Sequence, residues 1–523
     1  MNKLIRCLCG IGAGLILTGG CMTGLAAFAD ADGSFTEDGI TYQTVTGGVQ
    51  ASGADSKAEK LTIPAETKDG SKVLRIAENA FSPCTALKEV KIESGLTEIG
   101  NGAFSQCTAL ETISIPDSVV KIGAGVFYYC MALESLELPD SVREIGEYAF
   151  SNCYALKTVR LPRGLNTLPA YAFYYDIGLT EITLPDGLEH VSEMCFVNCL
   201  SMKTLSIPAS LTDLGEYSML SCMGLETIQV NPSNSMYRIN DQGWFVTKDG
   251  KTLVLYPAGR EEVSIVVPNG IQTIMPYAFS GSLALKEVKL PDSLETVGDG
   301  AFADCRLLDT INLPFRLTEL PPSLFANCAK LTSVSLPANL TAIQQYAFYC
   351  SGLSEIEIPE SVTEIGKCAF CGCDALREVT VPKTVTTIEE MAFGYTVNEE
   401  QEGEAPTVDP TFVLHGTPAS AAKAYAESAG VTFRQHGIDP TVLICVIVGA
   451  AAVLLIAGSL IRNRKKRSGA PEDPERKDAA EEITDPNYTS ILDDDPEDGD
   501  PYERNFGFAG EDDSESDEEP DSE

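Results

Sequence analysis

One aromatic position returns every twenty-three residues along most of this chain. A phenylalanine fills it in every copy but one, and the step from Phe348 to Phe370 is one residue shorter. A period held this strictly indicates one supersecondary unit stacked many times, so the sequence predicts a solenoid whose function lies on a surface. We call these residues anchors, and they are Phe81, Phe104, Phe127, Phe150, Phe173, Phe196, Met219, Phe279, Phe302, Phe325, Phe348, Phe370 and Phe393.

Each unit contains one short strand. Val159 and Leu161 are two residues apart, which puts both on one face of an extended segment while Arg160 points to the other. Pro162 has no N–H to donate, so the strand ends there. Successive strands should form a parallel sheet that grows by about 4.8 Å per unit. On the opposite side of the stack we expect short turns or single 3₁₀ turns, around the recurring Gly-x-x-Ala-Phe.

The whole unit matches a known repeat. The pattern Leu-x-x-Val-x-Leu-Pro-x-x-Val-x-x-Ile-Gly-x-x-Ala-Phe-x-x-Cys is nearly complete from Leu133 to Cys153. It resembles the bacterial leucine-rich repeat of the BspA-like surface antigens, and the resemblance covers about Ile76 to Phe393. It implies a leucine-rich-repeat solenoid with a parallel sheet on one face. It also implies a cell-surface role in adhesion or host contact.

Two flanking pieces interrupt or close the array. Two apolar segments flank Lys248-Asp249-Gly250-Lys251, which is a hairpin signal. Phe412–Phe433 resembles the closing helix and strand of the same family, and a solenoid needs caps at both ends. The predicted order is an N-terminal cap at 30–75, repeats at 76–230, an inserted hairpin at 231–262, repeats at 263–395 and a C-terminal cap at 396–437.

The N-terminus has the features of an export signal. Lys3 and Arg6 precede an apolar stretch, and Ala27-Phe28-Ala29 supplies small residues for a peptidase, so we predict a signal peptide at 1–29. The alternative is a lipoprotein signal at Cys21. A lipoprotein signal has leucine three residues before its cysteine, and this chain has Thr18 there.

A membrane anchor is predicted near the C-terminus. Thr441–Ile461 carries no charge and would form a helix of about 31 Å, so we predict a transmembrane helix at 438–461. Five basic residues follow between 462 and 467, which orients the C-terminus to the cytoplasm and the repeats outside. Residues 462–523 combine this basic stop with an acidic segment that we expect to be disordered. The tail serves either as a solvated spacer or as the docking site of a cytoplasmic partner.

Composition excludes several function classes. The chain has 76 acidic against 37 basic residues, so its field repels nucleic acid. The sequence contains three histidines and no arrangement that suggests a catalytic triad in a cleft. Cys368, Cys371 and Cys373 form the one dense cysteine cluster, but no fourth zinc ligand follows in sequence. We therefore predict no enzyme activity, no cofactor and no metal site.

Cysteines recur three residues after the anchors. Stacked coils would place them on one ladder at a spacing that permits disulfides. Asp176 and Ser282 replace two members, which a bridging framework would tolerate poorly, so we favour buried thiols that pack as small hydrophobes. The members are Cys84, Cys107, Cys130, Cys153, Cys199, Cys222, Cys305, Cys328 and Cys373.

The side chains that point out of the sheet form the candidate binding surface, which we call the outward column. It is polar and mixed in sign, which suits a protein contact better than stacking against sugar rings. Its members are Lys91, Ser114, Glu137, Arg160, Thr183, Ser206, Gln229 and Lys289. The alternative surface is aromatic and contains Tyr128, Tyr129, Tyr174, Tyr175 and Trp244. For the tyrosines we favour packing on the convex side over a second binding stripe, whereas Trp244 could equally be a binding anchor or a residue of the hairpin core.

These features predict a single-pass membrane protein whose extracytoplasmic repeats recognise a protein or cell-wall ligand without covalent chemistry. Two alternatives remain open. The chain could be a sensor that couples an external ligand to the acidic tail, or a scaffold for neighbouring membrane proteins.

The topology makes a direct prediction. Protease added to intact, wall-stripped cells should degrade the repeats and leave a small fragment that carries the acidic tail, because the membrane shields only the cytoplasmic side. Immunoblots against both ends read the result. Intact repeats beside a digested tail would reverse the orientation.

Overall fold

The computed structural model describes residues 33–397 and 405–436. The predicted signal peptide at 1–29, transmembrane helix at 438–461 and acidic tail lie outside this part of the chain. Within the described residues, no helix has the length and apolar character needed to cross a bilayer.

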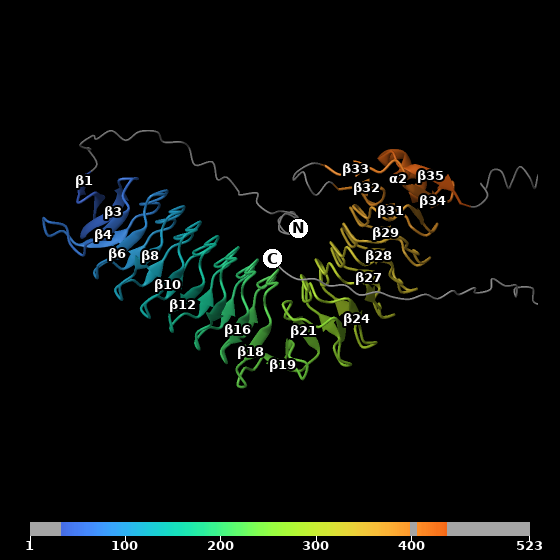
Figure 1. Cartoon of the computed structure of the whole chain (residues 1–523), viewed down its shortest axis with the longest axis horizontal. Helices are drawn as coiled ribbons and strands as arrows, with labels where there is room; N and C mark the ends of the chain where they lie inside the picture. Colours follow the sequence, from blue (N-terminus) through green and yellow to red (C-terminus); the bar gives the residue numbers. More distant parts are fainter. Residues whose placement is uncertain (1–32, 398–404, 437–523) are drawn as a thin grey trace, which may run out of the picture. The chain divides into compact units, whose positions relative to one another are not determined.

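The repeats stack in chain order, and their first strands pair in parallel (Figure 1). We call this set the first ladder. Most of its three-residue strands bury the central residue, as Leu136 and Val159 show, and expose the residues on either side. Its strands are β4 Lys60–Ile63, β6 Glu89–Ile92, β8 Thr112–Ser114, β10 Ser135–Glu137, β12 Thr158–Arg160, β14 Glu181–Thr183, β16 Thr204–Ile207, β18 Thr227–Val230, β22 Ser264–Val266, β24 Glu287–Lys289, β26 Thr310–Ile311 and β30 Glu378–Thr380.

A second ladder of parallel strands, most of them two residues long, lies later in each coil. This corrects the prediction of turns or 3₁₀ segments alone, since no 3₁₀ segment occurs in residues 33–397 or 405–436. Backbones approach closely here: a Cβ atom at Gly146 would lie 2.3 Å from the Ala124 nitrogen. The strands are β5 Val73–Ile76, β7 Glu98–Ile99, β9 Lys121–Ile122, β11 Glu144–Ile145, β13 Thr167–Leu168, β15 His190–Val191, β17 Asp213–Leu214, β23 Thr273–Ile274, β25 Thr296–Val297, β27 Glu319–Leu320, β28 Ala342–Ile343, β29 Glu364–Ile365 and β31 Thr387–Ile388.

The turn around each anchor also bonds to the next coil. The Phe127 N–H donates to the Ala149 carbonyl at 2.8 Å, and the Phe150 N–H donates to the Ala172 carbonyl at 3.0 Å. Residues two before and two after the anchor are left-handed, with φ of 58° at Tyr148 and 63° at Asn152. Such a backbone costs a non-glycine residue about 1–2 kcal/mol, so the contacts of these side chains must offset it.

The two ends are closed by different elements. At the N-terminal end, antiparallel strands β1 Ser34–Glu37, β2 Ile40–Val45 and β3 Gly48–Ala54 lead into the parallel pairing of β3 with β5. At the C-terminal end, β34 Val413–Gly416 pairs in parallel with β30 and with β35 Thr432–Gln435, and helix α2 Ala421–Ala429 connects β34 to β35. Strands β32 Tyr395–Thr396 and β33 Thr407–Val408 pair beside them. The Tyr425 hydroxyl accepts a hydrogen bond from the Phe393 N–H and donates one to the Phe393 carbonyl. It therefore satisfies both backbone polar groups of the last anchor.

Strands β19 Tyr237–Ile239, β20 Phe245–Thr247 and β21 Thr252–Leu255 interrupt the array. β20 pairs antiparallel with both neighbours, and β21 continues in parallel into β23. Trp244 and Phe245 are adjacent, and they belong to the second and first core clusters respectively. The insertion therefore joins the cores of the two blocks.

The anchors form the centre of the core. All are buried, and from Phe81 to Phe196 consecutive rings stack with centroids 5.1 to 6.0 Å apart. In the second block, from Phe279 to Phe393, the spacing is 4.8 to 5.9 Å. Each anchor therefore depends on the coil before and the coil after it.

The cysteine ladder has a hydrogen-bonding role. The Cys107 thiol donates to the Phe81 carbonyl at 3.2 Å, and the Cys153 thiol donates to the Phe127 carbonyl at 3.1 Å, one coil back. Burial raises the pKa of Cys107 to about 12, so this thiol stays protonated and unreactive. Among the residues that the structure describes, no disulfide joins any pair of cysteines.

Asp176 occupies this ladder as a carboxyl group. Its Oδ1 accepts the Cys153 N–H at 2.8 Å, while its Oδ2 is buried and has no partner among the described residues. Burial raises the pKa of Asp176 well above its ordinary value. The carboxyl is therefore neutral over part of the pH range in which an unfolded chain would ionise it.

The anchor stack predicts a large cost for removing one ring. Phe150→Ala should lower the free energy of unfolding by about 3–5 kcal/mol, the usual range for a buried aromatic. Tyr148→Ala, at a position 36 % exposed, is the control and should lose about 0.5–1.5 kcal/mol. Denaturant unfolding of the full-length protein measures both. A Phe150→Ala loss below about 1 kcal/mol would place this ring outside the core.

Asp176 predicts a pH dependence of stability. Above about pH 4 the unfolded state loses the proton that the folded state keeps, so stability should fall as pH rises towards the raised folded pKa. Asp176→Cys restores the ladder residue and should make this slope shallower, leaving the contributions of Asp299 and Asp304, whose pKa values burial also raises, while gaining about 1–3 kcal/mol at pH 8. Asp140→Asn removes a carboxyl whose pKa is lowered and should leave the slope above pH 5 unchanged. A wild-type stability that rises between pH 5 and 8 and is unaffected by Asp176→Cys would contradict this account.

Candidate functional site

The outward column lies where the sequence placed it, on the exposed side of the first ladder. All its predicted members are exposed except Ser206, which is half-buried. Sequence reasoning omitted Val266, which stands at the same offset from Phe279 and is 63 % exposed. A companion column on the other side of each buried strand residue is also exposed, apart from half-buried Thr204, and contains Glu89, Thr112, Ser135, Thr158, Glu181, Thr204, Thr227, Ser264 and Glu287.

An open groove of about 620 Å³ lies on this face, over β10, β12 and β14. Side chains from both columns line it, together with residues that follow the strands. Its floor is apolar at Leu136 and Val159, and its walls carry both signs of charge and several hydroxyls. The polar lining residues are Ser135, Glu137, Thr158, Arg160, Arg163, Thr183 and Asp186.

A small ion-pair network fixes one wall of the groove. The Arg160 guanidinium donates to the Leu138 carbonyl at 2.7 Å and to Asp140 Oδ1 at 2.9 Å. The Arg163 backbone N–H donates to the same Oδ1 at 3.1 Å, and this bond together with the Arg160 guanidinium lowers the pKa of Asp140. The Arg160 side chain thus links neighbouring coils and has a structural role although it lies on the outward column. Glu137 is exposed, so a substitution there tests binding with less effect on structure than a substitution of Arg160.

The tyrosines form a half-buried aromatic cluster at the turns. Tyr148 and Tyr171 stack at 4.5 Å, Tyr128 meets Tyr129 edge-on at 4.6 Å, and Tyr174 lies 4.7 Å from Tyr175. Contacts between coils, such as Tyr148 with Tyr171 and Tyr129 with Tyr154, brace the left-handed turns. This arrangement supplies the packing role that the sequence analysis favoured, while part of each ring remains at the surface.

Trp244 lies in the hairpin core. It is 3 % exposed and meets the Tyr256 and Phe279 rings edge-on at 5.5 and 6.1 Å. Its indole is therefore buried between the insertion and the second block. It offers no anchor on the surface.

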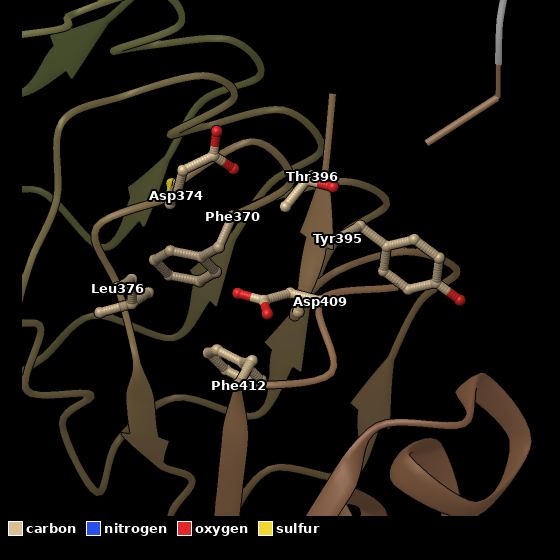
Figure 2. Close-up of a pocket in the computed structure, with 9 residues that line it drawn as sticks. Phe370, Asp374, Leu376, Tyr395, Thr396, Asp409 and Phe412 are labelled. Atoms are coloured by element: carbon tan, nitrogen blue, oxygen red, sulfur yellow. The ribbon is translucent and has the colours of Figure 1, made fainter. Parts of the chain in front are cut away.

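A second, much smaller cavity lies beside the C-terminal cap (Figure 2). It measures about 10 Å³, room for about one water molecule. Phe370 and Phe412 lie on two of its sides, and Asp409 points between them (Figure 2). Asp409 bonds to Arg377 at 3.2 Å and to the Thr411 hydroxyl at 2.7 Å. The cavity is too small to hold a substrate or cofactor.

The histidines that the structure describes near carboxylates, His190 and His415, lie on different strands and belong to separate ion pairs. His190 is exposed on β15 and faces Asp213 at 3.4 Å, while His415 on β34 faces Glu378 at 3.2 Å. Within the described residues, no group of three or more histidines, cysteines and carboxylates has metal-binding geometry. The structure does bring Cys350 beside the cluster of three cysteines, from the preceding coil. Sequence reasoning missed it because it searched for a partner nearby in sequence.

A family model described as the BspA type leucine-rich repeat region matches residues 54–179, 120–245 and 272–400. No curated protein matches the chain. A leucine-rich cell surface protein from Faecalibacterium prausnitzii A2-165 is 25 % identical, with a TM-score of 0.50, and the match covers 79 % of this chain and 100 % of that one.

Two further solved structures are similar at lower scores. A leucine-rich repeat protein from Bacteroides ovatus ATCC 8483 is 24 % identical over 77 % of this chain and 100 % of its own, with a TM-score of 0.43. The pneumococcal vaccine antigen PcpA is 19 % identical over 78 % of this chain and 99 % of its own, with a TM-score of 0.46. Because the family model covers more than half of the sequence, this chain belongs to the BspA-type leucine-rich-repeat family.

Proposed function

We propose that this protein is a membrane-anchored, extracytoplasmic recognition protein that binds a protein ligand through the outward face of its first ladder. The groove over β10, β12 and β14 is the centre of that surface. Its repeats lie outside the cell and its acidic tail lies in the cytoplasm.

The groove is the observation that carries this proposal. It combines an apolar floor with Glu137, Arg163 and Asp186 on its walls, and no core requirement fixes their outward side chains. A mixed-sign, hydroxyl-rich surface fits the polar composition of reversible protein interfaces. Stacked strands extend the same face in both directions, which can supply the roughly 800 Å² per partner of an ordinary interface.

Family membership supports a cell-surface role. The solved relative from Faecalibacterium prausnitzii is described as a cell surface protein, and the match covers its whole chain. The predicted signal peptide and the charge-free segment before the basic stop support an extracytoplasmic location for the repeats of this chain. The acidic tail keeps a sensor as the alternative, in which ligand binding outside is coupled to a cytoplasmic partner.

Photocrosslinking in intact cells tests the proposed face. A photoreactive amino acid at Thr183, exposed in β14, should form an adduct with a protein, because it lies in the groove. The same group at Lys121, exposed in β9 on the second ladder, is the control and should give none. Glu137→Ala should lower the Thr183 adduct yield about tenfold, as expected for loss of about 1.4 kcal/mol at an interface centre.

Three results would contradict the proposal. Adducts from Tyr175 with none from Thr183 would move the working surface to the aromatic cluster. A polysaccharide adduct at Thr183 would replace the protein ligand by a wall polymer. Equal adduct yields from Thr183 and Lys121 would mean that the ligand does not bind the first ladder in preference to the second.

A further inference from the structure

In some coils, two side chains meet across the turn that carries the anchor. They stand two residues before and one residue after it. Tyr171 and Tyr174 occupy these places around Phe173, with ring centroids 5.6 Å apart, and Tyr346 and Tyr349 do so around Phe348, also at 5.6 Å. Around Phe370 the same two places hold Cys368 and Cys371.

The backbone holds these two cysteines close. The Cys371 N–H donates to the Cys368 carbonyl at 3.2 Å, which closes a four-residue turn. Residues at the ends of such a turn have Cα atoms less than about 7 Å apart. A disulfide needs about 4.4–6.8 Å, so the turn brings the pair to bonding range.

Cys350 joins them from the preceding coil. Its N–H donates to the Cys371 carbonyl at 2.9 Å. Its sulfur lies over Gly372, since a Cβ atom at that glycine would come within 2.6 Å of the Cys350 Sγ. Cys350 is half-buried, whereas Cys368 and Cys371 are buried. Cys350 is therefore the most exposed residue of the three.

The electrostatic setting of Cys368 differs from that of the ladder. Hydrogen bonding from Cys371 lowers the pKa of Cys368; burial opposes this, and the Lys367 ammonium and Tyr346 hydroxyl add to it. Glu390 also faces the thiol and pairs with Lys367 at 2.6 Å. Cys373, a ladder member next to this group, instead donates to the Phe348 carbonyl at 3.0 Å.

We propose that Cys350, Cys368 and Cys371 form a thiol–disulfide exchange site that takes a disulfide-bearing molecule as its substrate. Cys350 receives the substrate disulfide, and the Cys368–Cys371 pair holds the resulting bond. This site is independent of the proposed ligand-binding face.

The reaction balances as three exchanges. The Cys350 thiolate attacks one sulfur of the substrate R–S–S–R, forming a mixed disulfide and releasing RS⁻. Cys371 then passes its proton to the hydrogen-bonded Cys368, and its sulfur attacks the Cys350 sulfur and releases the second RS⁻. This RS⁻ takes the proton from Cys368, and the Cys368 thiolate attacks the Cys371 sulfur and releases Cys350. Overall two thiols lose two protons and two electrons, and the substrate becomes two molecules of RSH. Reversal delivers a disulfide to a dithiol.

Mass spectrometry of the full-length protein tests this scheme. The protein is equilibrated with reduced and oxidised glutathione at graded ratios, quenched with acid, denatured, alkylated and cut with trypsin. Cys368, Cys371 and Cys373 fall on one tryptic peptide, residues 368–377, while Cys350 falls on residues 331–367. We expect the peptide at 368–377 to carry one alkyl group and an internal disulfide instead of the three alkyl groups of its reduced form, while Cys107 and Cys130 remain alkylated.

Variants taken from the repeat itself separate the roles. Cys371→Ser is matched by Ser151 and Ser280 at the same place, and should abolish the internal disulfide without loss of folding. Cys368→Tyr, matched by Tyr148 and Tyr171, should also abolish it and leave a Cys350–Cys371 crosslink between the two peptides. Cys350→Ser should reach the same internal disulfide about tenfold more slowly, because solvent access to the pair is lost.

Oxidation of Cys107 and Cys130 at the same glutathione ratio as the 368–377 peptide would show general thiol oxidation and overturn the site. So would a peptide at 368–377 that stays reduced in fully oxidised glutathione. A Cys350–Cys371 crosslink as the wild-type end product would overturn the assigned pair, and an unchanged rate in Cys350→Ser would overturn the role of Cys350.

Discussion

The structure depends on one repeated constraint: every anchor ring must stack on the rings of the coils before and after it. Strand pairing sets a coil-to-coil spacing of about 4.8 Å, and the anchors meet it with ring centroids 4.8 to 6.0 Å apart. The stack therefore holds every anchor in register with its neighbours, and even the one shorter step, from Phe348 to Phe370, keeps its two rings stacked at 5.2 Å.

The same constraint separates structural from functional positions. Residues that face the interior are fixed by the stack, including cysteines whose thiols donate to the anchor carbonyls one coil back. Residues that face outward on the first ladder meet no such requirement, and recognition can evolve there without loss of the fold. The turns around the anchors are constrained less than the interior and more than the outward face. Their side chains brace left-handed backbone and also lie at the surface, which allows tyrosines in one coil and cysteines in another.

The period made the solenoid and the outward column predictable from the sequence. The second ladder was missed because two-residue strands carry too little alternation to distinguish them from turns. Val266 was missed although its offset from Phe279 equals that of its neighbours, because the insertion broke the count. Cys350 was missed because its partner, Cys371, lies twenty-one residues away in sequence although the two residues are in adjacent coils. Whether Trp244 is exposed depends on how the insertion docks, and the sequence contains no signal for that.

The claim that the outward face of the first ladder is the working surface is tested most directly by electron cryomicroscopy of the full-length protein bound to its crosslinked partner. The account predicts that the partner covers the exposed sides of β10, β12 and β14 and leaves the tyrosine cluster uncovered. A partner seated on the turns around Tyr174 and Tyr175, with the groove empty, would contradict it.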